Sequence, residues 1–216
     1  KNNGLTIALL AIFSFSLIGQ YISGWKVYAE EELQHGNTPV GLAQYVAEPH
    51  FLEALFENWE SEFLQMAVYV LFTAFLYQRG SSESKTPGTT ERVDVIAESS
   101  KNDPRTPWPV RRGGLWLKLY ENSLSAALLF LFALSWLLHL INGAKLYNSE
   151  QIAHGQPPIS TLEFLGNSQF WFESFQNWQS EFLSIAVMVV LTIFLRQRGS
   201  PESKPVDALH SATGTS

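Results

Sequence analysis

The amino-acid sequence predicts an all-α membrane protein with four transmembrane helices, formed by two tandem parallel repeats of two helices each, with short interfacial helices in the exterior loops. Three observations lead to this fold class. The apolar residues of the 216-residue chain gather in four long runs. A later part of the chain repeats the first part. The basic residues are concentrated in two of the segments outside the runs, which assigns each loop to a side of the membrane.

The four apolar runs have the length of membrane-spanning helices. A helix crosses a hydrocarbon core of about 30 Å with about 20 residues. The first and third runs satisfy this alone, whereas the second and fourth do so only if their helices begin near Asn58 and Asn177. Spanning strands would have to close into a barrel, and the runs are continuous rather than alternating. The predicted spans are about 5–24, 58–78, 123–142 and 177–196.

The internal repeat is found when the sequence is shifted by 119 positions against itself. Asn3–Lys85 then aligns with Asn122–Lys204 without a gap, with 36 identities in 83 pairs and 19 of them in the last 28. Such a match indicates a tandem duplication. Because each copy has two spans, both copies enter the membrane in the same direction, related by a pseudo-twofold axis along the membrane normal. The predicted parts are a first repeat at 1–80, a flexible cytoplasmic linker at 81–118, a second repeat at 119–199 and a disordered cytoplasmic tail at 200–216.

The basic residues predict which side of the membrane each loop faces. The segment Arg79–Lys118 carries eight of them, among them Lys101, and the tail adds three more. The other two loops contain one lysine each, Lys26 and Lys145. Since lysine and arginine stay on the cytoplasmic side, both termini and the linker are expected to be cytoplasmic and the remaining loops exterior.

Each exterior loop is expected to form a lid that rests on the membrane surface. His35 and Pro39 in the first loop correspond to His154 and Pro158 in the second, each pair within the pattern His-Gly-x-x-Pro. Each proline is expected in the first turn of a short helix, and Ser160-Thr161-Leu162-Glu163 matches a capping box. The tryptophans near the membrane boundary predict an interfacial aromatic belt; they are Trp59, Trp171 and Trp178.

The sharpest feature is the pattern Asn-Trp-x-Ser-Glu, which occurs at Asn58–Glu62 and again at Asn177–Glu181. Glu62 and Glu181 are expected just inside the outer boundary of the hydrocarbon, where an ionisable side chain must face protein, a partner or water. The pseudo-twofold axis would bring the two glutamates near each other. The candidate polar stripe consists of Asn58, Ser61, Glu62, Asn177, Ser180 and Glu181, together with Gln20 and His139, which occupy equivalent positions in the two copies.

Three interpretations of this stripe remain open. Asparagine and serine could cap the outer ends of the helices, with glutamate favoured by the helix dipole. The stripe could line an ion or proton route, with His139 as a proton carrier, although a hydrogen bond between helices is an alternative role for His139 and Gln20. A metal site is the third interpretation, with His35, His154, Glu62 and Glu181 as weak candidate ligands.

Several classes of function are disfavoured by composition. The chain has no cysteine, which excludes disulfides and thiolate metal sites. Its net charge of −6, without a basic patch interleaved with aromatics, gives no indication of a nucleic-acid partner. No nucleophile–base pair or phosphate-binding glycine loop is found, so an enzyme is not expected, and no cofactor is indicated.

The repeated block also carries a resemblance to a known family. The segment NWQSEF at Asn177–Phe182, the closing segment at Arg196–Pro205 and the motif His154-Gly155-Gln156-Pro157-Pro158 resemble an uncharacterised family of small bacterial four-helix inner-membrane proteins, a domain of unknown function. The first copy departs from this pattern at Thr38 and at Tyr77. The resemblance covers nearly the whole chain and implies a multi-pass protein of the bacterial inner (plasma) membrane, without implying an activity.

The sequence therefore favours a small transport or channel-type protein whose polar stripe lines an ion or proton route. Four helices enclose little water, so a homo-oligomer or a larger membrane complex within the lipid bilayer is expected. One alternative is a structural or interaction subunit that binds another membrane protein through its exterior lid. The other is a metal-dependent membrane protein.

Overall fold

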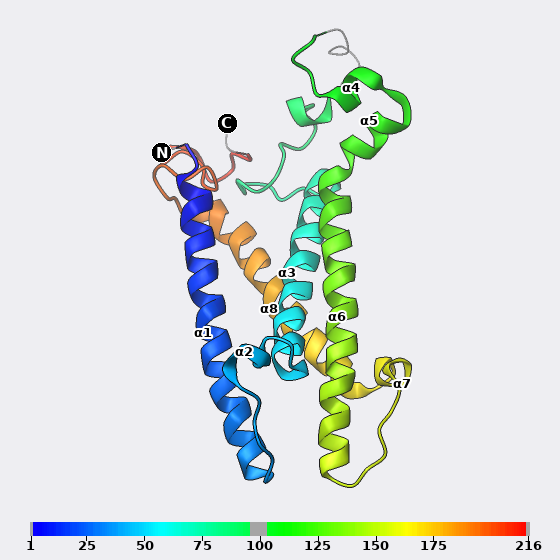
Figure 1. The fold of residues 1–216 in the computed structure, drawn as a ribbon. Helices are drawn as coiled ribbons and strands as arrows, with labels where there is room; N and C mark the ends of the chain where they lie inside the picture. The colour runs from blue at the N-terminus through cyan, green and yellow to red at the C-terminus, as the bar shows by residue number, and fades with distance from the viewer. Residues whose placement is uncertain (1, 96–102, 215–216) are drawn as a thin grey trace. The chain divides into compact units, whose positions relative to one another are not determined.

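The computed structural model describes residues 2–95 and 103–214, so Lys101 and part of the predicted linker lie outside the described residues. All regular secondary structure within these residues is helical (Figure 1), which confirms the all-α prediction. The helices are α1 (Gly4–Gln34), α2 (Leu42–Tyr45), α3 (Pro49–Phe75), the 3₁₀ helix η1 (Arg92–Asp94), α4 (Trp108–Arg112), α5 (Gly114–Glu121), α6 (Ser123–Ala153), α7 (Thr161–Leu165) and α8 (Ser168–Phe194).

Three described helices, α1, α6 and α8, are long and apolar enough to cross a membrane. The expectation of four such helices was wrong for α3. This helix has 27 residues, but it ends at Phe75 rather than near residue 78, and it carries Glu60, Glu62 and Gln65 inside the predicted span. These polar residues lower the apolarity of α3 below that of α1, α6 and α8.

The long helices occur in pairs of equal length. Helices α1 and α6 both have 31 residues, and α3 and α8 both have 27. Each pair begins and ends at positions that the internal alignment equates. The duplication itself stays a prediction from the sequence.

The chain divides into two compact units. Unit 1 consists of Lys1–Trp59 and Ser135–Glu173, and unit 2 consists of Glu60–Leu134 and Ser174–Ser216. Helices α3, α6 and α8 contribute residues to both units. The two units are described separately below.

In unit 1, two glycines allow the short helices α2 and α7 to pack against the long ones. A Cβ atom on Gly24 would lie 2.7 Å from the hydroxyl of Tyr45 in α2, and one on Gly143 would lie 3.0 Å from the ring of Phe164 in α7. Tyr45 and Phe164 are both almost fully buried. The glycine of the repeated motif Gly-x-Lys-x-Tyr therefore has a packing role, because any side chain there would displace the aromatic ring.

The His-Gly motif ends α1 and α6. Gly36 and Gly155 have positive φ angles of 76° and 69°, a conformation that glycine adopts without strain. After each glycine the chain turns back, and the N–H of Asn37 donates to the carbonyl of Glu32 at 2.8 Å. The equivalent bond in the second copy, from Gln156, is also 2.8 Å long. Both are Schellman motifs, so the glycine of this motif serves to end a helix.

The loops after α1 and α6 agree in part with expectation. The capping box is confirmed, because Ser160 accepts a hydrogen bond from the backbone of Glu163 and Glu163 accepts one from the backbone of Ser160. The expectation for the prolines was wrong. Helices α2 and α7 begin at Leu42 and Thr161, so Pro39 and Pro158 lie before the first turn. The hydrogen-bonding side chain of Ser160 sets the start of α7 instead.

In unit 2, the repeated motif Gln-Arg-Gly-Ser-x-Glu-Ser-Lys folds in the same way after α3 and after α8. Gly80 has a φ of 85° and Gly199 a φ of 84°, as a tight turn requires. The hydroxyl of Ser84 accepts a hydrogen bond from the N–H of Gln78 at 2.9 Å, and the equivalent bond in the second copy also measures 2.9 Å. The best-matched block of the repeat therefore closes the ends of two helices.

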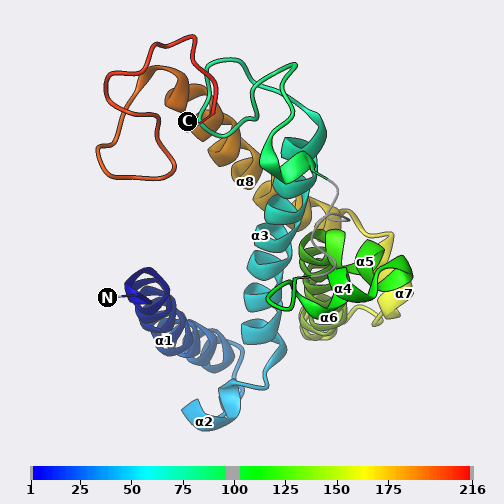
Figure 2. The same ribbon diagram turned by 90° about the horizontal axis from the view of Figure 1, so that it is seen from above.

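The linker and the tail contain more structure than expected. The predicted linker includes η1, α4 and most of α5. Figure 2 shows the segment after α3 beside the C-terminal tail, and the N–H of Gly214 donates to the carbonyl of Ser81 at 3.0 Å. Lys204 is buried, and its ammonium donates to three backbone carbonyls of the tail. The described part of the tail is therefore joined to the segment after α3 by hydrogen bonds, and its disorder stays a prediction from the sequence.

Replacement of Gly143 tests the packing of α7. We expect Gly143→Leu to push Phe164 out of its site and to raise amide hydrogen exchange over 161–165 about tenfold or more, since overpacking costs about 1–3 kcal/mol. Hydrogen-exchange mass spectrometry of the detergent-solubilised protein measures this. Gly19→Leu is the control, because a Cβ atom at Gly19 meets no atom within 4 Å. Equal exchange in the two variants would contradict the packing role.

Candidate functional site

A buried group of ionisable side chains lies in unit 1. His139 of α6 is 0% exposed. Its Nε2 lies 3.7 Å from Oε1 of Glu53 in α3 and 3.5 Å from Oε2 of Glu173 in α8. Glu57 is the fourth member, and we call these four residues the histidine–carboxylate cluster. His139 was predicted as a candidate site residue, but the three acids were not.

The geometry of α3 positions two of these acids. The helix begins at Pro49, so Glu53 and Glu57 lie one turn apart on the same face. One ligand atom each from Glu53, Glu57 and His139 lies within 4.8 Å of the others. Carboxylate oxygens and an imidazole nitrogen in this arrangement can hold a proton or a cation.

The surroundings of the cluster are apolar. The ring of His139 packs against Phe170 with 4.9 Å between the ring centroids. Phe170 belongs to a buried hydrophobic cluster with Leu140, Ala144 and Phe164. A charged side chain beside these apolar residues is destabilising unless it is paired or bound to a cation.

A second polar group lies in unit 2, where α3 and α8 carry the two glutamates of the repeated pattern. Glu62 is exposed and Glu181 is half-buried, and Glu62 lies near enough to act electrostatically on Glu181. The side-chain amide of Gln65 donates to the backbone carbonyl of Glu181 and to the hydroxyl of Ser184, both at 2.9 Å. We call Glu62 and Glu181 the glutamate pair.

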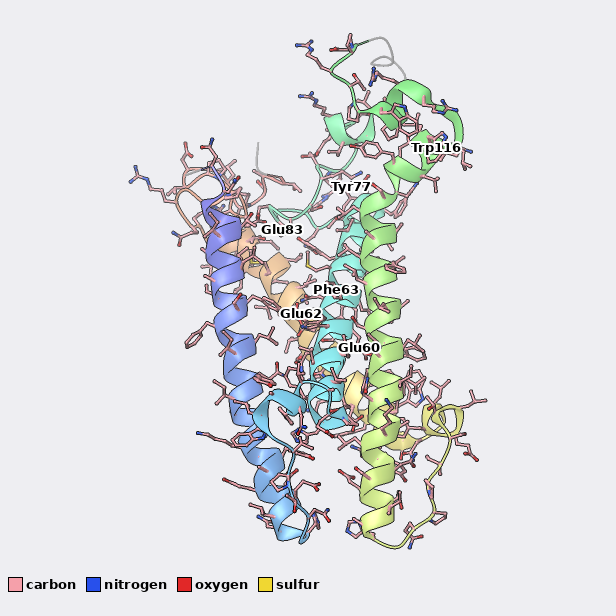
Figure 3. All side chains as sticks on the ribbon, viewed as in Figure 1. Glu60, Glu62, Phe63, Tyr77, Glu83 and Trp116 are labelled. Carbon is pink, nitrogen blue, oxygen red and sulfur yellow. The ribbon has the colours of Figure 1, made fainter. Side chains whose placement is uncertain are left out.

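Glu60 is a further acid of unit 2 that the sequence analysis missed. It is 0% exposed, and the indole N–H of Trp178 donates to it at 3.3 Å. Side chains two positions apart in a helix point in directions that differ by about 200° around its axis. Glu60 and Glu62 accordingly leave α3 toward different sides (Figure 3). The acids of α3 therefore serve different surfaces.

The capping interpretation of the repeated pattern was wrong. Helix α3 begins at Pro49 and α8 at Ser168, so Asn58 and Asn177 lie inside helices rather than at their ends. The side-chain amide of Asn58 donates to the backbone carbonyl of Ala54 at 2.7 Å. The hydroxyl of Ser180 donates to the backbone carbonyl of Asn177 at 2.8 Å. Ser61 is buried.

The predicted metal ligands belong to different parts of the molecule. His35 and His154 are exposed and line an open pocket of about 520 Å³ in unit 1, whereas Glu62 and Glu181 belong to unit 2. Among the described residues, the ligand atoms that converge are those of Glu53, Glu57 and His139 instead. Their convergence depends on packing between helices, which residue spacing alone does not reveal.

The remaining predicted residues have neighbours within their own units. Gln20 is half-buried in α1. The rings of Trp59 and Phe56 are 5.7 Å apart and those of Trp178 and Phe175 are 5.5 Å apart. The indole of Trp171 donates to the carbonyl of Leu165 at 2.9 Å. The placement of these tryptophans at a membrane interface stays a prediction.

Tyr45 of α2 forms a hydrogen bond with His50 of α3 within unit 1. The hydroxyl oxygen of Tyr45 is 2.6 Å from Nδ1 of His50. Burial, followed by the nearby charge of Glu31, raises the pKa of Tyr45 to about 12. The hydroxyl thus remains protonated at neutral pH.

The comparison of the two copies explains why the cluster was missed. It pairs Glu53 with Phe172, Glu57 with Gln176 and His139 with Gln20. A search for polar residues shared by both copies therefore passes over residues that occur in only one. One signal was present, since Glu53, Glu57 and Glu60 share a helix face at spacings of four and three residues.

Comparison with known proteins supports the predicted family resemblance. A family model described as a domain of unknown function matches residues 1–215. The searches of curated proteins and of solved structures found no match. The match confirms that the chain resembles an uncharacterised family over its whole length.

Proposed function

The chain belongs to the DUF6766 family, a domain of unknown function, and from its own residues we propose that it is a membrane transport or channel-type protein for cations, protons included. Three helices long and apolar enough to cross a bilayer make it compatible with a membrane protein. The proposed route follows the polar residues that α3 and α8 carry within unit 2.

The glutamate pair is the observation that supports this function best. Two carboxylates that act on each other attract a cation more strongly than either does alone, and the attraction grows as the surroundings lose water. Gln65 holds the backbone of α8 beside α3 through its two hydrogen bonds. Acidic side chains within membrane helices commonly mark ion or proton pathways.

We also propose that α3 forms a fourth span, so that the chain consists of two parallel repeats. The equal lengths of the paired helices support this arrangement. The polar residues of α3 would then face protein or water, because lipid cannot satisfy them. Both termini would be cytoplasmic and the His-Gly loops exterior, in the inner membrane of a bacterium.

A homo-oligomer is part of the proposal. Helix α1 has no buried residue in the described structure, and its apolar side chains need lipid or a second protein surface. We expect light scattering of the detergent-solubilised protein to give a multiple of the 24.3 kDa chain mass. A monomer that still transports ions would contradict this part of the proposal.

An interaction subunit is the second candidate. Leu162 on α7 is 78% exposed and Val46 beside α2 is 52% exposed. Apolar side chains of this kind on the exterior loops would suit contact with another membrane protein. The absence of ion flux in the experiment below would favour this candidate.

Ion flux into proteoliposomes tests the proposed route. We expect wild-type protein to carry protons or alkali cations, measured with an internal pH dye and with a cation-selective electrode. Glu62→Gln or Glu181→Gln should lower the flux about tenfold or more, because each removes a charge that attracts the cation. Glu121→Gln, on exposed α5, is the control and should leave flux unchanged. Background flux in the wild type would overturn the transport proposal.

The proposed topology can be tested by labelling single cysteines, because the natural chain contains none. We expect an impermeant maleimide to label Asn37→Cys and Gln156→Cys on intact spheroplasts. Thr89→Cys and Asp207→Cys should react only after the membrane is permeabilised. If Asn37→Cys and Thr89→Cys reacted from the same side, α3 would not cross the membrane.

A further inference from the structure

We propose that Glu53, Glu57, His139 and Glu173 bind one divalent transition-metal ion. These residues all belong to unit 1. The site is independent of the glutamate pair of unit 2, on which the proposed transport function depends.

The distances within the cluster suit a shared metal ion. His139 Nε2 lies 3.5 Å from Oε2 of Glu173 and 3.7 Å from Oε1 of Glu53. Both distances exceed the usual hydrogen-bond range of about 2.7–3.2 Å. Metal–ligand bonds of about 2.0–2.2 Å in a tetrahedron place neighbouring ligand atoms about 3.4 Å apart. The ligand atoms of Glu53, Glu57 and His139 lie within 4.8 Å of one another, so the carboxylates would have to move closer together to complete the coordination.

The charges of the cluster also favour a cation. The charged groups that act on Glu53 are Glu57, Glu173 and His139, so a single imidazole faces three carboxyl groups. His139 is fully enclosed and Glu53 is 8% exposed, which leaves little water to stabilise negative charge. Buried carboxyl groups hold a proton, form an ion pair or coordinate a metal. A divalent ion would take the place of the protons that these carboxyl groups would otherwise hold.

The carboxylate of Glu173 gives an independent indication. Its Oε2 is enclosed and has no hydrogen-bond partner within the described residues, and it is this atom that approaches His139. The other oxygen, Oε1, accepts a hydrogen bond from the side-chain amide of Gln169 at 2.5 Å. Gln169 thus fixes Oε1, while Oε2 points toward His139. Hydrogen bonds of this kind orient the carboxylates that bind metals in proteins.

The donor set indicates the class of metal. One imidazole nitrogen with carboxylate oxygens suits zinc, manganese or iron in the divalent state. Calcium and magnesium prefer oxygen ligands alone, and the chain has no cysteine for a soft metal such as copper(I). The packing of Phe170 against His139 holds the ring in one orientation. We therefore infer a site for a divalent ion of the first transition row.

The experiment uses the full chain purified in detergent without a polyhistidine tag and treated with a chelator. Cobalt(II) is then added as a probe, and its visible absorption and X-ray absorption report the number and type of ligands. We expect one equivalent to bind, with nitrogen and oxygen ligands and an imidazole scattering signal. Zinc added afterwards should displace the cobalt, as the order of metal affinities requires.

Two variants identify the ligands. His139→Gln removes the imidazole and introduces the residue that the first copy carries as Gln20, and Glu53→Gln removes one carboxylate. We expect each variant to weaken cobalt binding at least about tenfold. Even the loss of a residue that only hydrogen-bonds to a metal ligand lowers affinity by about this factor. His154→Gln, in the exposed exterior loop, is the matched control and should bind as the wild type does.

Each outcome decides the proposal. A wild type that takes up no cobalt, or cobalt without an imidazole ligand, overturns it. Unchanged affinity in His139→Gln and Glu53→Gln also overturns it. Should His139→Gln fail to fold, the spectrum of the wild type and the affinity of Glu53→Gln decide. Glu62→Gln should keep full cobalt binding whatever its effect on ion flux, so failure of the metal site and failure of the transport function can be told apart.

Discussion

The apolar surface of the long helices is the constraint on which the rest of this protein depends. Helix α1 has no buried residue, and most of its large apolar side chains are exposed. Such a surface is stable only against lipid or another apolar surface. Within lipid, each backbone polar group must be bonded inside its own helix, and each ionisable side chain needs a partner, an ion or water. In a membrane protein, the positions of acidic residues therefore carry more information than they do in a protein surrounded by water.

The residues that the two copies share mostly serve the framework. The His-Gly motif ends α1 and α6, and the glycine of Gly-x-Lys-x-Tyr admits an aromatic ring from α2 or α7. The motif that follows α3 and α8 folds into the same hydrogen-bonded turn each time. These are local or short-range requirements that any copy of the same helix pair must meet. Glu62 and Glu181 are also shared, and they form the glutamate pair of unit 2.

The histidine–carboxylate cluster has the opposite character, because each of its residues occurs in only one copy. The position equivalent to His139 is Gln20, and the position equivalent to Glu53 is Phe172. The proposed metal site therefore has no counterpart among the residues that the internal alignment pairs with it.

The sequence by itself determined the helical class, the positions of the long helices, the capping box at Ser160 and the membership of an uncharacterised family. The helical elements follow from apolar runs and helix-end residues, which act over short stretches of chain. It overestimated α3 as an apolar helix, because Glu60, Glu62 and Gln65 interrupt the run that was counted as a span. Only the tertiary structure decided that Glu53, Glu57 and Glu173 meet His139. These residues come from three helices far apart in the chain, and which helix faces meet depends on side-chain packing that no local pattern encodes.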